Sequence, residues 1–398
     1  MTRELEHKAE KTQASSDGAS PAPAQLRQLP PELWSLIFVS IADRATLLSA
    51  SLACRVAHRE VDPYLYREIV FKYWRNRYIC AVHDALEASP RRANMVQVLA
   101  IQSATGHIES TAVSALVDIF RMVPNLEGLS LTLFDETNVN TLYPVLEQLK
   151  TPCPFRLSSL STNIPLPQAA LSIYAQQPEI VSLRWNGSGP LDPASRIPST
   201  VLPRLKCLSC LAGYRPFNKS ARGITHLEVG IPSLLPSILS SPEINLILSL
   251  LADTLVSLKV LERRRGYARI MPAISHRIPK CLRHLEVHER ARPQSKAPLD
   301  PLLMSSQTYF THLFLEPGLT LETFVWGALW MRSSESNLEA SYQEEIQTLA
   351  EDLAIACRTL RRFILCEKNK SVTYTLRNGK VADRVELSGF SNDTWARV

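Results

Sequence analysis

The sequence predicts an α/β fold in which a small N-terminal helical unit is followed by an irregular solenoid with a parallel sheet. Two observations predict it. Two strongly apolar segments follow one another closely, at 29–41 and 47–58. From residue 96 onward, one apolar triplet with the spacing i, i+3, i+5 recurs. The 398 residues are enough for about two or three domains, or for a small domain with a repeat array.

The first apolar segment, LPPELWSLIFVSI, has the pattern of an amphipathic helix. Pro30 and Pro31 suit its first turn, where an amide hydrogen has no intrahelical partner. Two apolar stripes run along it, and their members are Leu33, Leu36, Ile37 and Ile41, and Trp34 and Phe38. A surface helix needs only one such stripe.

The second apolar segment, LLSASLACRVAH, also predicts a helix, with Asp43 as its N-cap. Its two stripes are Leu48, Leu52 and Val56, and Leu47, Ala50, Cys54 and Ala57. The two helices bury one face of each against the other. The remaining apolar faces need another cover.

The ends and the charge of the chain limit its location and its partners. Residues 1–28 lack the apolar core of a signal peptide and predict a disordered tail. No apolar window approaches the roughly 20 residues that span a bilayer. A net charge of +6 is too small to indicate nucleic-acid binding. We therefore expect a cytoplasmic or nuclear protein that binds neither nucleic acid nor membrane.

Although the net charge is small, arginine is concentrated in two short segments. They are Arg263 to Arg265, and Arg358 with Arg361 and Arg362. We interpret them as solvated loop and strand-edge charges. A phosphate site is the alternative.

No metal, cofactor or catalytic centre is predicted. Cys207 and Cys210 have a zinc-like spacing, but a zinc site needs a second pair of ligands, and LKCLSCLAG has a strand pattern. On a strand, His284 and His288 lie roughly 13 Å apart and cannot share an ion. The sequence has no G-x-S-x-G, P-loop or H-E-x-x-H motif and only 13 glycines. We therefore expect that the chain is not an enzyme.

The recurring triplet predicts the strands of residues 72–331 and of the C-terminal part. Its complete copies are Val96, Leu99, Ile101; Leu126, Leu129, Leu131; Ile180, Leu183, Trp185; Ile224, Leu227, Val229; Leu255, Leu258, Val260; Leu282, Leu285, Val287; Phe310, Leu313, Leu315; and Leu360, Phe363, Leu365. Weaker copies lie at Leu157 and Leu160 and at Leu205 and Leu208. The last two members alternate with a polar residue, which is the period of a strand. Stacked units of this kind bury a core together, although unrelated strands of an α/β fold are the alternative.

The C-terminal part, 332–398, predicts an end cap of the sheet. ESNLEASYQEEIQTLAEDLAIACRTL has helical periodicity, and RRFILCE follows it as the last repeat strand. Asn378 and Gly379 form a favoured pair for a hairpin turn.

The spacing of the triplets, mostly about 19 to 31 residues, resembles that of the irregular leucine-rich repeats of fungal, basidiomycete-type proteins. That family usually has Asn or Cys five residues after the middle leucine. Phe134, Ser188 and Pro232 stand at those positions here, so the side-chain ladder of the family is missing.

Residues 29–71 resemble an F-box. The family pattern is carried by Leu29, Pro30, Glu32, Leu33, Ile37, Phe38, Leu47, Leu48, Ser51, Leu52, Cys54 and Arg55. The resemblance implies docking on a Skp-family adaptor, and through it on a cullin, as the substrate-recognition subunit of an SCF-type ubiquitin ligase. The residues expected to bind the adaptor are Leu29, Pro30, Leu33, Trp34, Ile37, Phe38, Leu47, Leu48, Leu52 and Cys54. The pattern often has Trp where this chain has Ala57, so a large apolar contact is missing.

Strand positions on the side away from the core are predicted to contact a client protein. They are His226, Glu228, Lys259, His284, Glu286, His288, His312 and Phe314. Stacking of the strands places Ser257 between His226 and His284, with His312 beyond. A row of histidines beside mixed charge suits an acidic or phosphorylated segment, and an ordinary solvated face is the alternative. The alternative function is a repeat-type interaction scaffold whose F-box remnant does not bind the adaptor.

Overall fold

The chain divides into two compact units, residues 1–65 and residues 66–398. The computed structural model describes residues 30–41, 43–72, 76–103, 109–133, 145, 147, 153–163, 173–185, 198, 200–211, 223–231, 247–262, 278–289, 318–328, 339–366 and 370–388. Within these ranges, no helix combines the length and the apolar character that crossing a membrane requires.

Short helices form the N-terminal unit: α1 (Pro31–Ser40), α2 (Arg44–Ala53) and α3 (Arg55–Tyr66), whose last residue lies in the second unit. The Asp43 carboxylate accepts a hydrogen bond from the Thr46 amide at 2.8 Å, which confirms the predicted N-cap of α2. The prediction of one helix through 47–58 is wrong. Cys54 is extended, and its Sγ accepts a hydrogen bond from the Ala57 amide at 3.3 Å, so a new helix starts there.

This unit has a small core of its own. Phe38, Leu47, Ala57 and Val61 are buried together. Trp34 stacks on Phe38 with ring centroids 5.4 Å apart. Ala57, where the F-box pattern often has Trp, therefore faces the interior of the unit.

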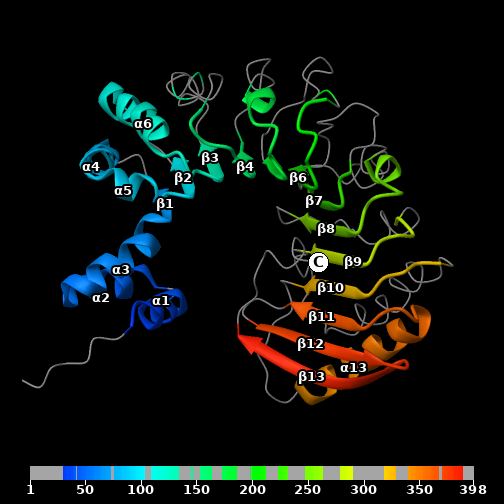
Figure 1. The fold of residues 1–398 in the computed structure, drawn as a ribbon. Coiled ribbons are helices and arrows are strands. Elements are labelled where there is room, and N and C mark those ends of the chain that lie inside the picture. Colours follow the sequence, from blue (N-terminus) through cyan, green and yellow to red (C-terminus); the bar gives the residue numbers. More distant parts are fainter. Residues whose placement is uncertain are drawn as a thin grey trace, which may run out of the picture. The chain divides into compact units, whose positions relative to one another are not determined.

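The second unit holds one sheet of thirteen described strands in strict chain order. They are β1 (Glu68–Phe71), β2 (Val98–Ser103), β3 (Gly128–Leu133), β4 (Ser159–Thr162), β5 (Ser182–Trp185), β6 (Cys207–Leu211), β7 (His226–Ile231), β8 (Ser257–Glu262), β9 (His284–Glu289), β10 (Thr323–Ala328), β11 (Arg362–Cys366), β12 (Lys370–Arg377) and β13 (Lys380–Ser388). Strands β1 to β11 are parallel, and β12 and β13 are antiparallel (Figure 1). The mixed α/β class with a mostly parallel sheet is confirmed.

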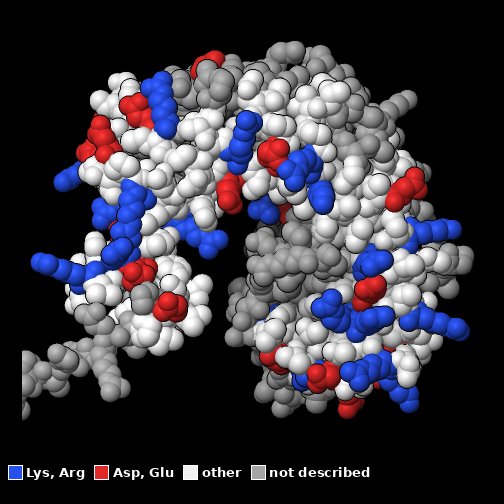
Figure 2. Space-filling model, viewed as in Figure 1, with Lys and Arg blue, Asp and Glu red and all other residues white. Residues whose placement is uncertain are grey.

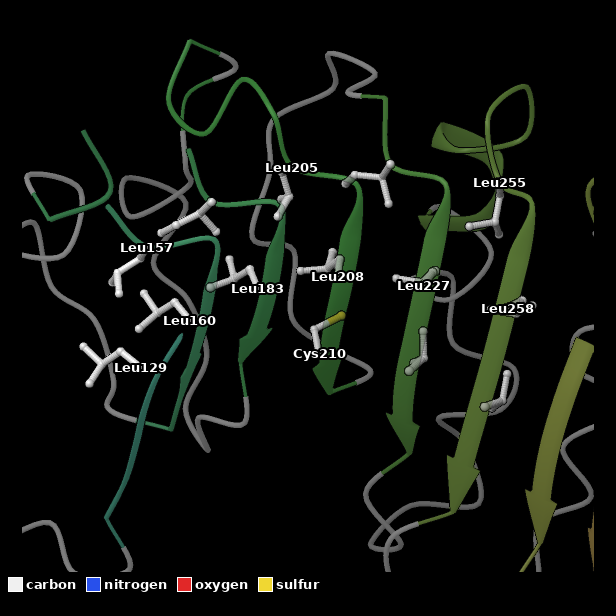
Figure 3. Packing of buried hydrophobic residues seen from close by; sticks show 14 of the residues in the cluster. Leu129, Leu157, Leu160, Leu183, Leu205, Leu208, Cys210, Leu227, Leu255 and Leu258 are labelled. Carbon is white, nitrogen blue, oxygen red and sulfur yellow. The ribbon is translucent and has the colours of Figure 1, made fainter. Parts of the chain in front are cut away.

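The apolar triplets form continuous rows across this sheet. Leu99 pairs with Leu129 and Leu129 with Leu160, and the row of middle residues continues through Leu183, Leu208, Leu227, Leu258 and Leu285. Figure 3 shows part of this row, with the leading residues Leu157, Leu205 and Leu255 beside it. The shared register therefore places every middle leucine against the next one.

Helices cover the apolar face of the sheet near its first strands and near its last strands. They are α4 (Asn76–Glu87), α5 (Pro90–Ala93), α6 (Ser110–Met122) and α13 (Glu339–Ala356). Leu116 and Ile119 of α6 and Leu349 and Leu353 of α13 are buried in the same core as the strands. The predicted C-terminal helix and strand are thus confirmed.

Two strands were not predicted, although their sequences carry the same spacing. Strand β1 is preceded by Tyr66 and contains Ile69 and Phe71. Strand β10 follows Leu321 and contains Phe324 and Trp326. The strand expected at 310–315 lies outside the described residues. The expectation that residues 68–71 belong to the N-terminal unit is wrong, because β1 pairs with β2 and is part of the sheet.

The last two strands form the predicted hairpin. Asn378 and Gly379 have φ angles of 54° and 76°, and such positive values suit Asn and Gly in a tight turn. Phe324, Phe363 and Tyr374 stack across β10, β11 and β12, with successive ring centroids 5.7 and 5.9 Å apart. The hairpin therefore continues the apolar core beyond the last parallel strand.

Candidate functional site

Exposed apolar side chains are concentrated in the N-terminal unit. Of the eleven large apolar side chains exposed in the described residues, seven lie in it: Leu33, Leu36, Ile37, Val39, Leu48, Leu52 and Val56. Leu52 is 78 % exposed and Leu36 is 64 % exposed. Isolated exposed apolar residues are ordinary, but a concentration of this size usually marks an interaction site.

The predicted adaptor-binding residues separate into two groups. Six are exposed: Pro30, Leu33, Ile37, Leu48, Leu52 and Cys54. Trp34 is half-buried, and Leu29 lies outside the described residues. The expectation is wrong for Phe38 and Leu47, because the unit's own core encloses them. Leu36 and Val39 are exposed beside the predicted residues and were not assigned to this site, although Leu36 belongs to the first apolar stripe.

On the second unit, the predicted client-binding residues form rows, as the triplet spacing indicated. His226 pairs with Ser257 and Ser257 with His284. The next residue in this row is Thr323 of β10 and not His312. His312 and Phe314 lie outside the described residues. The neighbouring row runs from Glu228 through Lys259 to Glu286.

The carboxylate of Glu286 is the centre of a buried ionic cluster. Lys259 Nζ lies 2.8 Å from its Oε1, and His288 Nε2 lies 2.5 Å from the same oxygen. His284 Nε2 lies 3.7 Å from Oε2. We call Lys259, His284, Glu286 and His288 the Glu286 cluster. All four are buried, on the face of the sheet opposite the apolar triplets.

The charges around Glu286 decide its protonation. Burial alone would raise the pKa of this carboxyl, but the imidazoles of His284 and His288 and the charge of Lys259 outweigh burial and lower the pKa from 4.5 to about 2. Glu286 therefore stays ionised and pairs with Lys259. Burial, assisted by the Glu286 charge, raises the pKa of the Cys366 thiol.

A second carboxylate on the same face has partners of its own. Ser209 Oγ donates a hydrogen bond to Glu228 Oε1 at 2.8 Å, and Arg184 Nη2 lies 3.8 Å from Oε2. Opposite charges therefore alternate along Arg184, Glu228, Lys259 and Glu286. Arg184 and Glu228 lie on β5 and β7, with Ser209 of β6 between them, whereas Lys259 and Glu286 pair directly across β8 and β9.

This burial corrects the expectation of an accessible row. Glu228, Lys259, His284, Glu286 and His288 are all buried. His226 is half-buried, and burial, followed by the charges of His284 and Lys206, lowers its pKa. These side chains support the sheet and do not present a free surface for a client. The strand alternation predicted their face correctly, but not their burial.

The described side chains give no support to the zinc alternative. Cys207 and Cys210 lie three residues apart in β6 and therefore point to opposite faces, with Cys210 in the apolar core. Among the described residues, the side chains close enough to hold an ion together are His83, Asp84 and Glu87 of α4, which are mostly exposed. Acidic surface groups of this kind are common without a metal.

No family model matches the chain, and no curated protein matches it either.

Proposed function

We propose that this chain is the substrate-recognition subunit of an SCF-type cullin-RING ubiquitin ligase. The N-terminal unit acts as an F-box that docks on a Skp-family adaptor, and the second unit, an irregular leucine-rich-repeat-like solenoid, binds the client protein. The observation that carries the proposal is the set of seven exposed apolar side chains on residues 33–56. The chain itself supplies binding surfaces and no catalytic step.

The exposed set is a surplus beyond what the unit needs for folding. Phe38 and Leu47 already supply its core together with Ala57 and Val61. Burying one large aliphatic side chain completely contributes about 1.5 to 3 kcal/mol. Seven such side chains within three short helices therefore favour a large, mainly apolar interface, as an obligate partner offers.

The second unit supports the repeat part of the proposal. Each described strand pairs with its neighbour in the chain, and the leucines form rows across the sheet. An array of this kind grows by addition of units, and its long surface suits protein binding. Because long surfaces of this kind suit protein binding, the client that we propose for the second unit is a protein.

The proposal is tested by co-purification with a Skp-family adaptor. We expect the full chain to elute with the adaptor as one complex in size-exclusion chromatography. Leu48→Asp with Leu52→Asp abolishes this complex, because two exposed apolar contacts become buried charges. Val385→Asp with Leu387→Asp is the matched control, since these side chains are also exposed but lie on β13.

The alternative is an interaction scaffold whose F-box remnant does not bind the adaptor. One observation favours it: Phe38 and Leu47 are enclosed by the unit itself and are not offered to a partner. If the wild-type chain and the adaptor elute separately in size-exclusion chromatography, this alternative is supported. Equal loss of binding in the β13 control would also contradict an interface at Leu48 and Leu52.

A further inference from the structure

An open groove of about 980 Å³ lies between the end of α13, the starts of β10 and β11, and the β12–β13 turn. A second cavity of about 440 Å³ shares three of its lining residues. The charged residues of the two are Arg283, Glu322, Arg358, Arg361, Arg362 and Arg377. We call these six residues the arginine groove.

Positive charge dominates this groove, with five arginines against one glutamate. All five arginine residues are exposed. Arg283 Nη1 lies 3.9 Å from Glu322 Oε1, while the other four arginines have no ion-pair partner among the residues that the structure describes. Figure 2 shows several basic side chains, with acidic ones between them, over β10 to β13. The groove therefore has a positive excess that a ligand could neutralise.

The backbone ladder explains why residues distant in sequence meet here. The Glu322 amide donates to the Arg283 carbonyl at 2.8 Å, and the Arg361 amide donates to the Glu322 carbonyl at 2.9 Å. The Leu376 amide continues the ladder to the Arg361 carbonyl at 2.8 Å. The arginines thus stand beside the starts of β9 and β11 and at the end of β12, and Glu322 precedes β10 between them.

This spacing limits the kind of anion. Four strands cover three intervals of about 4.8 Å, so the arginines are spread over roughly 14 Å. A single phosphate or carboxylate group is much smaller than that distance. Arg358, Arg361 and Arg362 gather at the start of β11, so a ligand that also reaches Arg283 and Arg377 must carry more than one anionic group along its length.

The other lining residues separate the possible ligands. Ile355 of α13 is 67 % exposed at the groove and offers an apolar contact. Neither described lining includes an aromatic side chain, and single-stranded nucleic acids depend on such rings for stacking. The lining therefore favours a ligand with both acidic and apolar side chains.

We propose that the arginine groove binds an extended acidic protein segment in which Asp or Glu side chains stand beside an apolar one. Guanidinium groups pair with carboxylates through paired hydrogen bonds. Only the use of this groove to select a client depends on the function proposed above. Binding of the segment itself depends on the second unit alone.

The test uses the full chain without adaptor and a labelled peptide of alternating glutamate and leucine. We expect binding in fluorescence anisotropy that weakens with added salt. The same peptide with glutamine in place of glutamate binds at least about tenfold more weakly. Because no adaptor is present, failure of adaptor docking and failure of this proposal give different results.

Two sets of variants locate the binding. Arg358→Gln with Arg361→Gln weakens binding about tenfold, because two charge-assisted contacts are lost. Arg77→Gln with Arg121→Gln removes the same charge from exposed sites on α4 and α6 and leaves binding unchanged. Glu322→Gln removes the only carboxylate of the described lining. We expect this variant to bind the peptide about threefold more tightly. Because it does not remove an arginine, it still tests the proposal if an arginine variant is unstable.

Three outcomes would overturn the proposal. The first is equal binding of the glutamate and glutamine peptides. The second is an equal effect of the groove variants and the control pair. The third is tighter binding of a single-stranded oligonucleotide, or of a peptide whose only anionic group is one phosphoserine, than of the glutamate peptide.

Discussion

The Nζ atom of Lys259 lies 2.8 Å from Oε1 of Glu286, and these residues are only 1 % and 0 % exposed. The two residues pair directly across β8 and β9, on the face opposite the apolar core. Removing one member of a buried ion pair leaves an uncompensated charge, which costs far more than the net contribution of the pair. This pair therefore makes the polar face of the sheet sensitive to single substitutions.

Lys259→Met should destabilise the second unit by about 3 to 5 kcal/mol, because the Glu286 carboxylate loses its ammonium partner. Chemical denaturation followed by tryptophan fluorescence measures the change. Lys380→Met, at an exposed position on β13, should have little effect. A loss below about 1 kcal/mol for Lys259→Met would show that the pair is hydrated in solution.

The stability of the second unit should depend on pH through Glu286. Its pKa is lowered from 4.5 to about 2, so the folded state favours the ionised form. This contribution to stability is fully present at a pH above the pKa of Glu286 in the unfolded chain. It is lost as the pH falls toward the pKa of Glu286 in the folded chain. Over this range wild type should lose on the order of 3 kcal/mol more than Glu286→Gln. Parallel pH curves of unfolding free energy for the two proteins would rule out this role of Glu286.

Gly327→Ala should destabilise the sheet because β10 passes directly beside the His288 ring. A Cβ atom at Gly327 would overlap this imidazole, which is already fixed on Glu286 at 2.5 Å. We expect a loss of about 1 to 3 kcal/mol in thermal or chemical unfolding. Gly223→Ala is the matched control, since nothing lies within 4 Å of its added Cβ. Equal stability of the two variants would mean that His288 moves aside freely.

Phe38→Ala should open the core of the N-terminal unit, with a loss of about 3 to 5 kcal/mol. Leu52→Ala should leave its folding unchanged, because this side chain is mostly exposed. Hydrogen exchange of the amides in α1 to α3 measures both effects. Faster exchange in Leu52→Ala than in Phe38→Ala would contradict the burial of Phe38.

The strands were predictable where the sequence repeats the triplet in Leu, Ile and Val. Strand β10 has the same spacing but carries Phe324 and Trp326, so its resemblance to the aliphatic copies was missed. Strand β1 was assigned to the F-box because the resemblance to that motif extends over residues 29–71. The break at Cys54 was hidden by helical periodicity on both sides of it.

The functional surfaces were harder to predict than the strands. Alternation within a strand indicates which face a side chain takes, but not what lies over that face, so the burial of Lys259 and Glu286 was missed. The Arg358, Arg361 and Arg362 cluster was visible in the sequence, with a phosphate site as the alternative. Its connection to Arg283 and Arg377 depends on the strand order, which no local pattern contains.

The strict chain order of the strands allows the connections between them to differ in length. The two longest connections between paired parallel strands flank β10, yet β10 keeps its full register with β9 and with β11. Residues inserted or deleted between strands thus need not disturb the pairing. A change in the length of these connections would alter the surface at the edge of the sheet while the rows of middle apolar residues stay in place.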